Sequence, residues 1–247
     1  MSVKKIAGVF ALSAIALALS ACGGDDGPAP GPNHRPNTPN APAAGLLPEK
    51  IEFDVVEERL MPGARVPLEA ELEAGRDRDV PASSAANVEV SIVRDDTGGA
   101  QLSGTQLSTN QQGEARFSIT LGRNTGTVIV KATTDGADNN VANGISDELA
   151  ALLGMVVTPG GNGLNWEVPA VIDARTGGTV RLEDPDDGQR GRTYSINDSR
   201  FTLAQCRGDD DVCLGVKNTT RAGSYNVELG VNDGSNTLVM PVTIVVR

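Results

Sequence analysis

Histidine is nearly absent from this chain of 247 residues, and its single copy excludes several kinds of catalysis. His34 lies in a run of proline and asparagine, where too few apolar residues are present to bury a side chain. Triads of serine, histidine and aspartate, Cys-His catalysis and histidine-based zinc sites all need a positioned imidazole. We therefore expect a protein that is not an enzyme and has no catalytic residues. Acid pairs such as Asp184 with Asp186 leave an enzyme as the third hypothesis, but no partner residue completes a recognisable site.

Basic residues are in the minority. The chain has 21 Lys and Arg residues against 32 Asp and Glu residues, a formal charge of -11, and an isoelectric point of about 4.6. A chain with this excess of negative charge is repelled by phosphate backbones. We therefore expect no nucleic-acid partner.

A hydrophobic run near the N-terminus has the pattern of a secretory signal. Lys4 and Lys5 precede an apolar stretch from Ile6 to Leu19, and small residues follow it. The stretch is short for a membrane span, which needs about 20 apolar residues. A charged start, a short apolar stretch and small residues before the cleavage point are typical of a signal peptide. We predict that residues 1–21 are removed, and the alternative is an uncleaved anchor helix.

The end of this segment, Leu19-Ser20-Ala21-Cys22, resembles the lipobox of bacterial lipoproteins. In that family the cysteine is acylated and becomes the first residue of the mature chain. The resemblance implies a lipid anchor on Cys22, with the membrane as a partner through that anchor. Gly23, rather than aspartate, follows the cysteine, which in enteric-type lipoproteins implies forwarding to the outer membrane. The side of the membrane that the protein faces stays open.

Residues 22–48 are dense in proline, glycine and asparagine and contain few large apolar residues. Such a composition does not form a core and favours an extended chain of about 3 Å per residue. We therefore expect a spacer between the lipid and the folded part.

Beyond the spacer, short alternating β-branched runs lie between turn signals, and no long helical stripe is present. This pattern favours an all-β fold with two Ig-like β-sandwich domains in tandem, at 49–135 and 155–247. The expected strands are 51–56, 65–73, 88–94, 101–107, 115–121, 127–133, 167–173, 179–183, 192–196, 201–205, 212–217, 224–231 and 238–246. Between the domains, we expect 136–154 to be a connection with a short helix, which Ser146 caps and Gly154 follows.

The first of these domains resembles the bacterial Ig-like domain of invasins and intimins over roughly residues 55–134. The resemblance is carried by the turn Thr109-Asn110 to Gly113-Glu114-Ala115 and by the strand Gly126-Thr127-Val128-Ile129-Val130-Lys131-Ala132. In that family the domain is a spacer or display unit without catalytic residues, so the resemblance implies none here.

The second domain resembles a degenerate bacterial cadherin-type repeat. The resemblance rests on the segments Asp184-Pro185-Asp186, Tyr194-Ser195-Ile196 and Val231-Asn232-Asp233-Gly234. Only Asp184, Asp186 and Asp233 match its calcium-binding pattern, and calcium takes six to eight oxygen ligands. We expect weak calcium binding or no cofactor at all, with these acids more simply explained as a solvated turn.

Two cysteines remain once Cys22 is committed to lipid. Cys206 and Cys213 lie between two expected strands, in a compartment that permits disulfides, and we predict that they are bonded. The loop between them contains Arg207-Gly208-Asp209, the tripeptide that integrin ligands display. We interpret the tripeptide as incidental, with integrin recognition as the alternative.

The order of signal, lipid site, spacer and tandem sandwiches predicts a lipid-anchored protein of the cell envelope that displays Ig-like domains for adhesion or protein-protein interaction. The alternative is a periplasm-facing accessory lipoprotein that docks onto a larger envelope assembly through an edge strand or its acidic surface. The sequence does not identify the protein partner.

Overall fold

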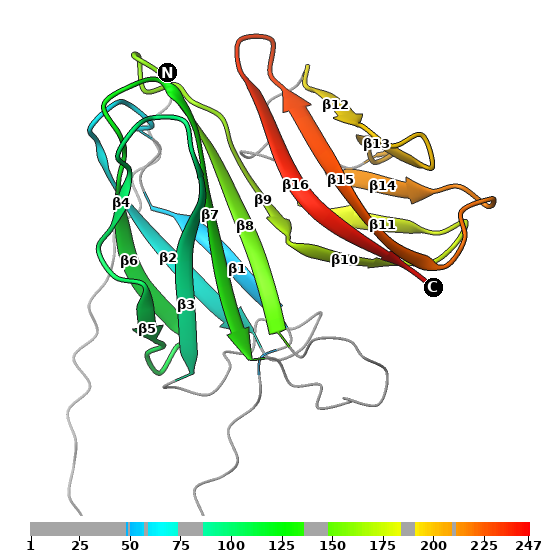
Figure 1. Ribbon diagram of the computed structural model, residues 1–247, viewed down its shortest axis with the longest axis horizontal. Coiled ribbons are helices and arrows are strands. Elements are labelled where there is room, and N and C mark those ends of the chain that lie inside the picture. Colours follow the sequence, from blue (N-terminus) through cyan, green and yellow to red (C-terminus); the bar gives the residue numbers. More distant parts are fainter. Residues whose placement is uncertain are drawn as a thin grey trace, which may run out of the picture. The chain divides into compact units, whose positions relative to one another are not determined.

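The computed structural model describes residues 48, 50–56, 59–73, 86–135, 148–183, 191–208 and 211–247. Within these ranges the regular elements are sixteen strands (Figure 1). No helix long and apolar enough to cross a membrane occurs in this part of the chain. The expected signal peptide, Cys22 and nearly all of the expected spacer lie outside the described residues.

The first sandwich consists of two sheets in which every pair of neighbouring strands is antiparallel. In spatial order, one sheet contains β1 (Lys50–Val55), β2 (Arg65–Glu73), β6 (Glu114–Thr120) and β4 (Gln101–Leu102), and the other contains β5 (Gln106–Ser108), β3 (Asn87–Asp95), β7 (Gly126–Asp135), β8 (Glu148–Val157) and β9 (Asn165–Pro169). Alternation builds the core, because successive side chains of a strand point to opposite faces. In β2, for example, Val66, Leu68, Ala70 and Leu72 are buried.

The second sandwich also has two sheets. In spatial order, one contains β10 (Val171–Ala174), β16 (Thr237–Val246), β15 (Gly223–Asn232) and β12 (Thr193–Ile196), and the other contains β11 (Thr179–Leu182), β14 (Val212–Val216) and β13 (Phe201–Gln205). The short β10 runs parallel to β16, and the remaining pairs are antiparallel. Two tandem Ig-like sandwiches are therefore present, as expected from the sequence.

A single residue passes the chain from one sandwich to the other. The Ala170 N–H donates to the Ala150 carbonyl on β8 at 2.8 Å, and the Ala170 carbonyl accepts from the Thr243 N–H on β16 at 2.9 Å. Thus β9 ends the first sandwich and β10 begins the second without a free linker between them.

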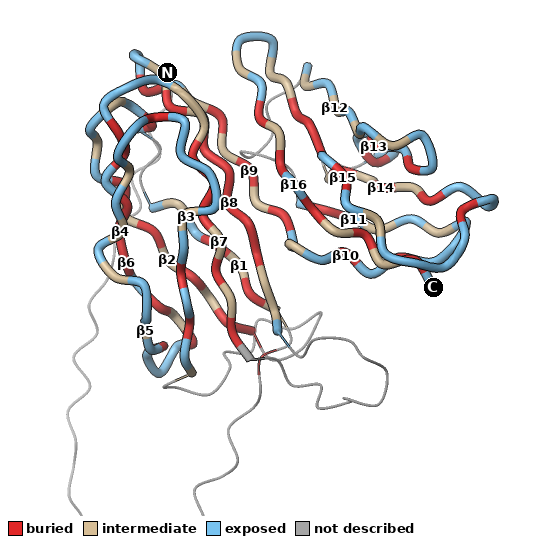
Figure 2. The backbone as a smooth tube through the Cα atoms, in the orientation of Figure 1, coloured by how far each residue is buried: buried red, intermediate tan, exposed pale blue. Residues whose placement is uncertain are grey.

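The part of the sheet around Ile129 of β7 and Leu152 of β8 is buried on both of its faces. Val128 and Val130 of β7 pack into the core of the first sandwich, whereas Ile129, between them, and Leu152 of β8 belong to the core of the second. Buried residues accordingly follow one another along β7 and β8 (Figure 2). The two cores thus share the strands that separate them.

Most expected strands are confirmed, but the expected short helix is wrong. Residues 148–157 form strand β8, which pairs with both β7 and β9. Leu149, Leu152 and Leu153 have a spacing that also suits one side of a helix, and a strand buried on both faces has no alternation to distinguish it. Consequently the expected boundary at 154/155 falls inside a strand, and the first sheet continues to Pro169.

Gly154 lies at a point where β8 comes close to β16. A Cβ atom at this position would lie 2.3 Å from the Met240 sulfur and 2.9 Å from a Leu238 methyl carbon. We predict that Gly154→Ala lowers the free energy of unfolding by about 1–3 kcal/mol, the usual cost of overpacking a core. Urea denaturation of the two proteins measures the difference.

The matched control is Gly160→Ala. A Cβ atom there meets only an Asn162 side-chain nitrogen at 4.0 Å, so this variant should stay within about 0.5 kcal/mol of the parent protein. Equal stability of the two variants would contradict the close contact between β8 and β16.

Candidate functional site

The hairpin of β13 and β14 is closed by a disulfide. Cys206 and Cys213 are bonded, with Cα atoms 5.0 Å apart, as predicted from the sequence. The Cys206 N–H also donates to the Asp211 carbonyl at 2.7 Å, so both a covalent bond and a backbone hydrogen bond join the chain on the two sides of the turn. This arrangement supports a structural role for the cysteines.

The turn of this hairpin exposes Arg207 and Gly208, and Gly208 has a φ of 83°. Asp209 lies outside the described residues. At the other end of this loop, Asp211 forms an ion pair with Arg181 at 3.2 Å. An incidental role for Arg207-Gly208-Asp209 stays a prediction.

Replacing both Cys206 and Cys213 by serine should lower the free energy of unfolding. The bond spans a sequence separation of 7, and the entropy of closing such a loop is worth about 2.5 kcal/mol. Thermal unfolding without reductant measures the loss. Dithiothreitol should lower the unfolding temperature of the parent protein to that of the variant and leave the unfolding temperature of the variant unchanged. A parent protein whose unfolding temperature does not respond to dithiothreitol would contradict the prediction.

The expected calcium residues are not brought together in the part of the chain that the structure describes. Asp184 and Asp186 lie outside it. Asp233 accepts the Ser235 N–H at 2.7 Å and the Asn236 N–H at 2.6 Å. Burial raises the pKa of Asp233, but these hydrogen bonds outweigh it and hold the pKa below its ordinary value. The Asp233 carboxylate therefore stabilises the turn that it belongs to through these hydrogen bonds.

Within the described ranges, no group of three or more His, Cys, Asp or Glu side chains is arranged to hold a metal ion. Asp95 illustrates how such acids are used instead. It accepts hydrogen bonds from Thr97, Gly98, Gly99 and Ala100 in one turn, and its pKa falls to about 2, chiefly because of the Thr97 hydroxyl. Weak calcium binding at Asp184, Asp186 and Asp233 stays a prediction.

Acidic side chains gather on the outer face of the first sandwich, which sequence reasoning missed. We call this surface, on β1, β2 and β6, the acidic face. It consists of Glu52, Asp54, Glu69, Glu71, Glu73 and Glu114, with Lys50 and Arg116 as the cations among them. Each of these residues alternates with buried ones along its strand. The alternation is visible in the sequence, but the pairing of the three strands is not.

The register places like charges directly opposite one another. Glu71 lies between Glu52 on β1 and Glu114 on β6. Like charges at facing positions of a sheet are destabilising. Burial, followed by Glu73 and Glu114, raises the pKa of Glu71 above its ordinary value. This row of three acids therefore costs the folded protein stability.

The cations on the acidic face are already engaged. Arg116 pairs with Glu69 at 3.0 Å and with Glu114 at 2.9 Å. Lys50 pairs with its neighbour Glu52 and, at 3.3 Å, with Glu183. Glu73 is only 9% exposed, and no described residue forms a hydrogen bond or ion pair with it.

A further carboxylate is enclosed where the first sandwich ends. Glu167 of β9 accepts the Phe53 N–H of β1 at 2.8 Å. Next to it, the Trp166 indole N–H donates to the Glu183 carbonyl at 3.0 Å. Although residue 167 as a whole is partly exposed, its carboxyl is enclosed by protein, and this burial raises the pKa well above its ordinary value.

Glu167→Gln tests this assignment through the pH dependence of stability. Because the pKa is higher in the folded state, the unfolded chain ionises first as the pH rises above about 4.5. The parent protein should therefore lose stability relative to the variant from that pH upward, and the variant should be the more stable at pH 7.5. The glutamine oxygen can still accept the Phe53 N–H.

Urea unfolding at a series of pH values measures the two curves. Glu89→Gln, at an exposed position of β3, is the matched control and should follow the parent protein. If the free energies of unfolding of the parent protein and the Glu167→Gln variant differ by the same amount from pH 4 to 8, the carboxyl group is not enclosed.

The fold and these surfaces define an all-β protein of two Ig-like sandwiches in which surface charge is the main candidate for recognition. Neither a protein-family model nor a curated protein matches the sequence. Solved structures do match it. Domains 4–9 of the surface layer protein SbsC have 13% identity and a TM-score of 0.28, with 82% of this chain and 32% of that chain covered.

Two other matches come from named bacteria. The Escherichia coli adhesin FdeC has 12% identity and a TM-score of 0.28, and the match covers 78% of this chain and 62% of that chain. InvD of Yersinia pseudotuberculosis has 12% identity and a TM-score of 0.21, with 80% and 57% covered. At these identities and TM-scores the matches carry no conclusion about this chain. The chain spans about a third of the surface-layer fragment and about three fifths of the adhesin.

Proposed function

We propose that this chain is a lipid-anchored protein of the cell envelope, at the outer membrane, that displays its two sandwiches for adhesion or protein-protein interaction. In this proposal Cys22 carries the lipid and residues 22–48 hold the folded part away from the membrane. The chain itself does no chemistry, and its partner is another protein.

The observation that carries the proposal is the junction between the sandwiches. Ala170 bonds to both sheets, and Ile129 and Leu152 are buried in the second core although they belong to the first sheet. Two sandwiches joined in this way present their surfaces in a fixed relation, which suits display. The resemblance of Leu19-Ser20-Ala21-Cys22 to a lipobox supplies the attachment.

The alternative is a periplasm-facing accessory lipoprotein. The acidic face supports a docking role of this kind as well, because it carries excess charge that no described residue neutralises. The two functions differ in the side of the membrane on which the sandwiches stand.

Cys22→Ser should release the protein from membranes, because acyl chains on this cysteine provide the attachment in the proposal. The measurement is fractionation of cells followed by a carbonate wash, with Cys206→Ser as the control that keeps the lipid site. A Cys22→Ser protein that remains with the washed membranes would refute lipid attachment.

Protease treatment of intact cells then separates the two functions. Digestion of the sandwiches in unbroken cells supports surface display. Protection in intact cells, followed by digestion after the outer membrane is opened, supports the periplasmic alternative and refutes display.

A further inference from the structure

A group of basic side chains lies at one end of the second sandwich. We call it the basic end, and it consists of Arg175, Arg200, Lys217, Arg221 and Arg247. Backbone contacts bring it together: the Thr176 N–H donates to the Arg247 carbonyl at 3.2 Å, and the Lys217 N–H donates to the Arg200 carbonyl at 3.0 Å. The Thr176 hydroxyl donates to the Thr220 carbonyl at 3.0 Å, which adds the remaining loop.

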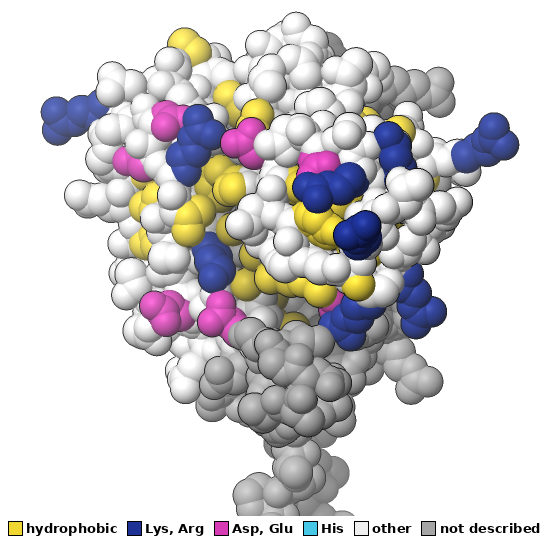
Figure 3. Space-filling view, turned by 45° about the vertical axis from the view of Figure 1, so that its right-hand side comes forward, with side chains coloured by type: hydrophobic (Ala, Val, Ile, Leu, Met, Phe, Trp, Pro, Cys, Tyr) yellow, Lys and Arg dark blue, Asp and Glu magenta, His cyan; other side chains and the backbone are white. Residues whose placement is uncertain are grey.

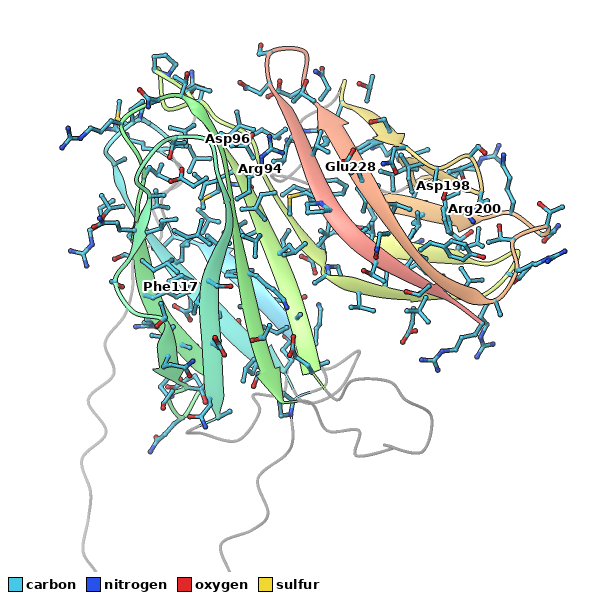
Figure 4. The ribbon with its side chains drawn as sticks, viewed as in Figure 1. Arg94, Asp96, Phe117, Asp198, Arg200 and Glu228 are labelled. Atoms are coloured by element: carbon cyan, nitrogen blue, oxygen red, sulfur yellow. A yellow bond between two sulfur atoms is a disulfide. The ribbon has the colours of Figure 1, made fainter. Side chains whose placement is uncertain are left out.

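Two of these cations, Arg200 and Arg247, have an acidic partner among the described residues. Arg200 pairs with Asp198, as the labelled side chains in Figure 4 show, and its guanidinium also lies 4.1 Å from the centre of the Tyr225 ring. Arg247 pairs with Asp173 at 3.1 Å. Arg175, Lys217 and Arg221 are exposed and have no ion pair with any described residue. In Figure 3, Lys and Arg side chains accordingly stand out on the right-hand part of the surface.

The acidic face has a charge opposite to that of the basic end, and its carboxylates are spread widely enough to bind several cations at once. Its carboxylates lie in rows across neighbouring strands, which are about 4.8 Å apart. They are not arranged to hold one metal ion. Glu73, nine-tenths buried, adds a carboxylate that forms no hydrogen bond or ion pair with a described residue. An array of Lys and Arg side chains matches this surface better than a single ion does.

We propose that the basic end of one molecule docks on the acidic face of a second copy of the same chain. The two surfaces have opposite charge and lie on different sandwiches. Among the described residues, no ion pair joins them within one molecule. Contact between two different surfaces is heterologous, so each added copy leaves one acidic face and one basic end free, and the molecules form a row that stays open or closes into a ring.

A zero-length carbodiimide cross-link tests the contact directly, because it joins an amine only to a carboxylate that touches it. The experiment uses the full chain in one detergent, as an equal mixture of ¹⁵N-labelled and unlabelled protein. We expect mixed-isotope cross-links from Lys217 to Glu69, Glu71, Glu73 or Glu114. Mixed cross-links that avoid the acidic face, or none at all, would overturn the proposal.

Lys217→Arg is the matched control for the chemistry. It keeps the positive charge but removes the amine, so the cross-link should disappear while association stays within twofold. Loss of association in this variant would contradict a contact based on charge.

Charge reversal tests which surfaces pair. Asp54→Lys with Glu71→Lys places each new cation opposite glutamates, Glu69 for the first and Glu52 and Glu114 for the second. This double variant relieves the repulsion in the acidic row and should therefore fold, while weakening self-association at least tenfold. Arg175→Glu with Arg221→Glu should do the same from the other side. When the two double variants are mixed, each should still fail to associate with itself. The unchanged basic end of the first variant should, however, bind the unchanged acidic face of the second.

Light scattering at 0.05 M and 0.5 M salt measures these states, since salt screens contacts between exposed charges. The control pair is Glu89→Lys and Arg123→Glu, which change the charge elsewhere on the first sandwich and should associate like the parent protein. Association of the parent that is unaffected by salt, or by either double variant, would overturn the proposal. So would a basic end that binds vesicles of anionic lipid while the protein stays monomeric.

Discussion

The burial of strands β7 and β8 on both faces, around Ile129 and Leu152, is the constraint on which the rest of the structure depends. An ordinary sandwich sheet has one face in the core and one in water. Here the second face is covered by the next sandwich, because Ile129 and Leu152 pack into its core and Gly154 admits Met240. Separating the two sandwiches would expose this apolar surface, at roughly 25 cal/mol for each Å².

The backbone strengthens the same junction. Ala170 satisfies its N–H in one sheet and its carbonyl in the other, so no flexible residue separates β9 from β10. Tandem domains with a free linker move independently as the default. The sandwiches of this chain do not move independently in this way, so the acidic face and the basic end keep a fixed relation within one molecule.

The sequence was informative wherever one residue or one strand carried the signal. Alternation placed β2 and β13 at their observed bounds, and the pair Cys206 and Cys213 followed from elimination and compartment. It failed at β8, because a strand that is apolar on both sides has no period to read. The acidic face was missed for another reason: Glu52, Glu71 and Glu114 are far apart in the chain, and only the register of three strands aligns them.

The carboxylate of Glu167 has a consequence for the free edge of β1. Unpaired N–H groups along an edge strand are templates on which another chain can add a strand, which leads to aggregation. The Phe53 N–H is not available in this way, since it already donates to Glu167. The carboxyl group of Glu167 on β9 therefore protects the edge of β1 at Phe53 against unwanted strand addition. Burying this carboxyl group costs stability, and the protected edge is what the fold gains from it.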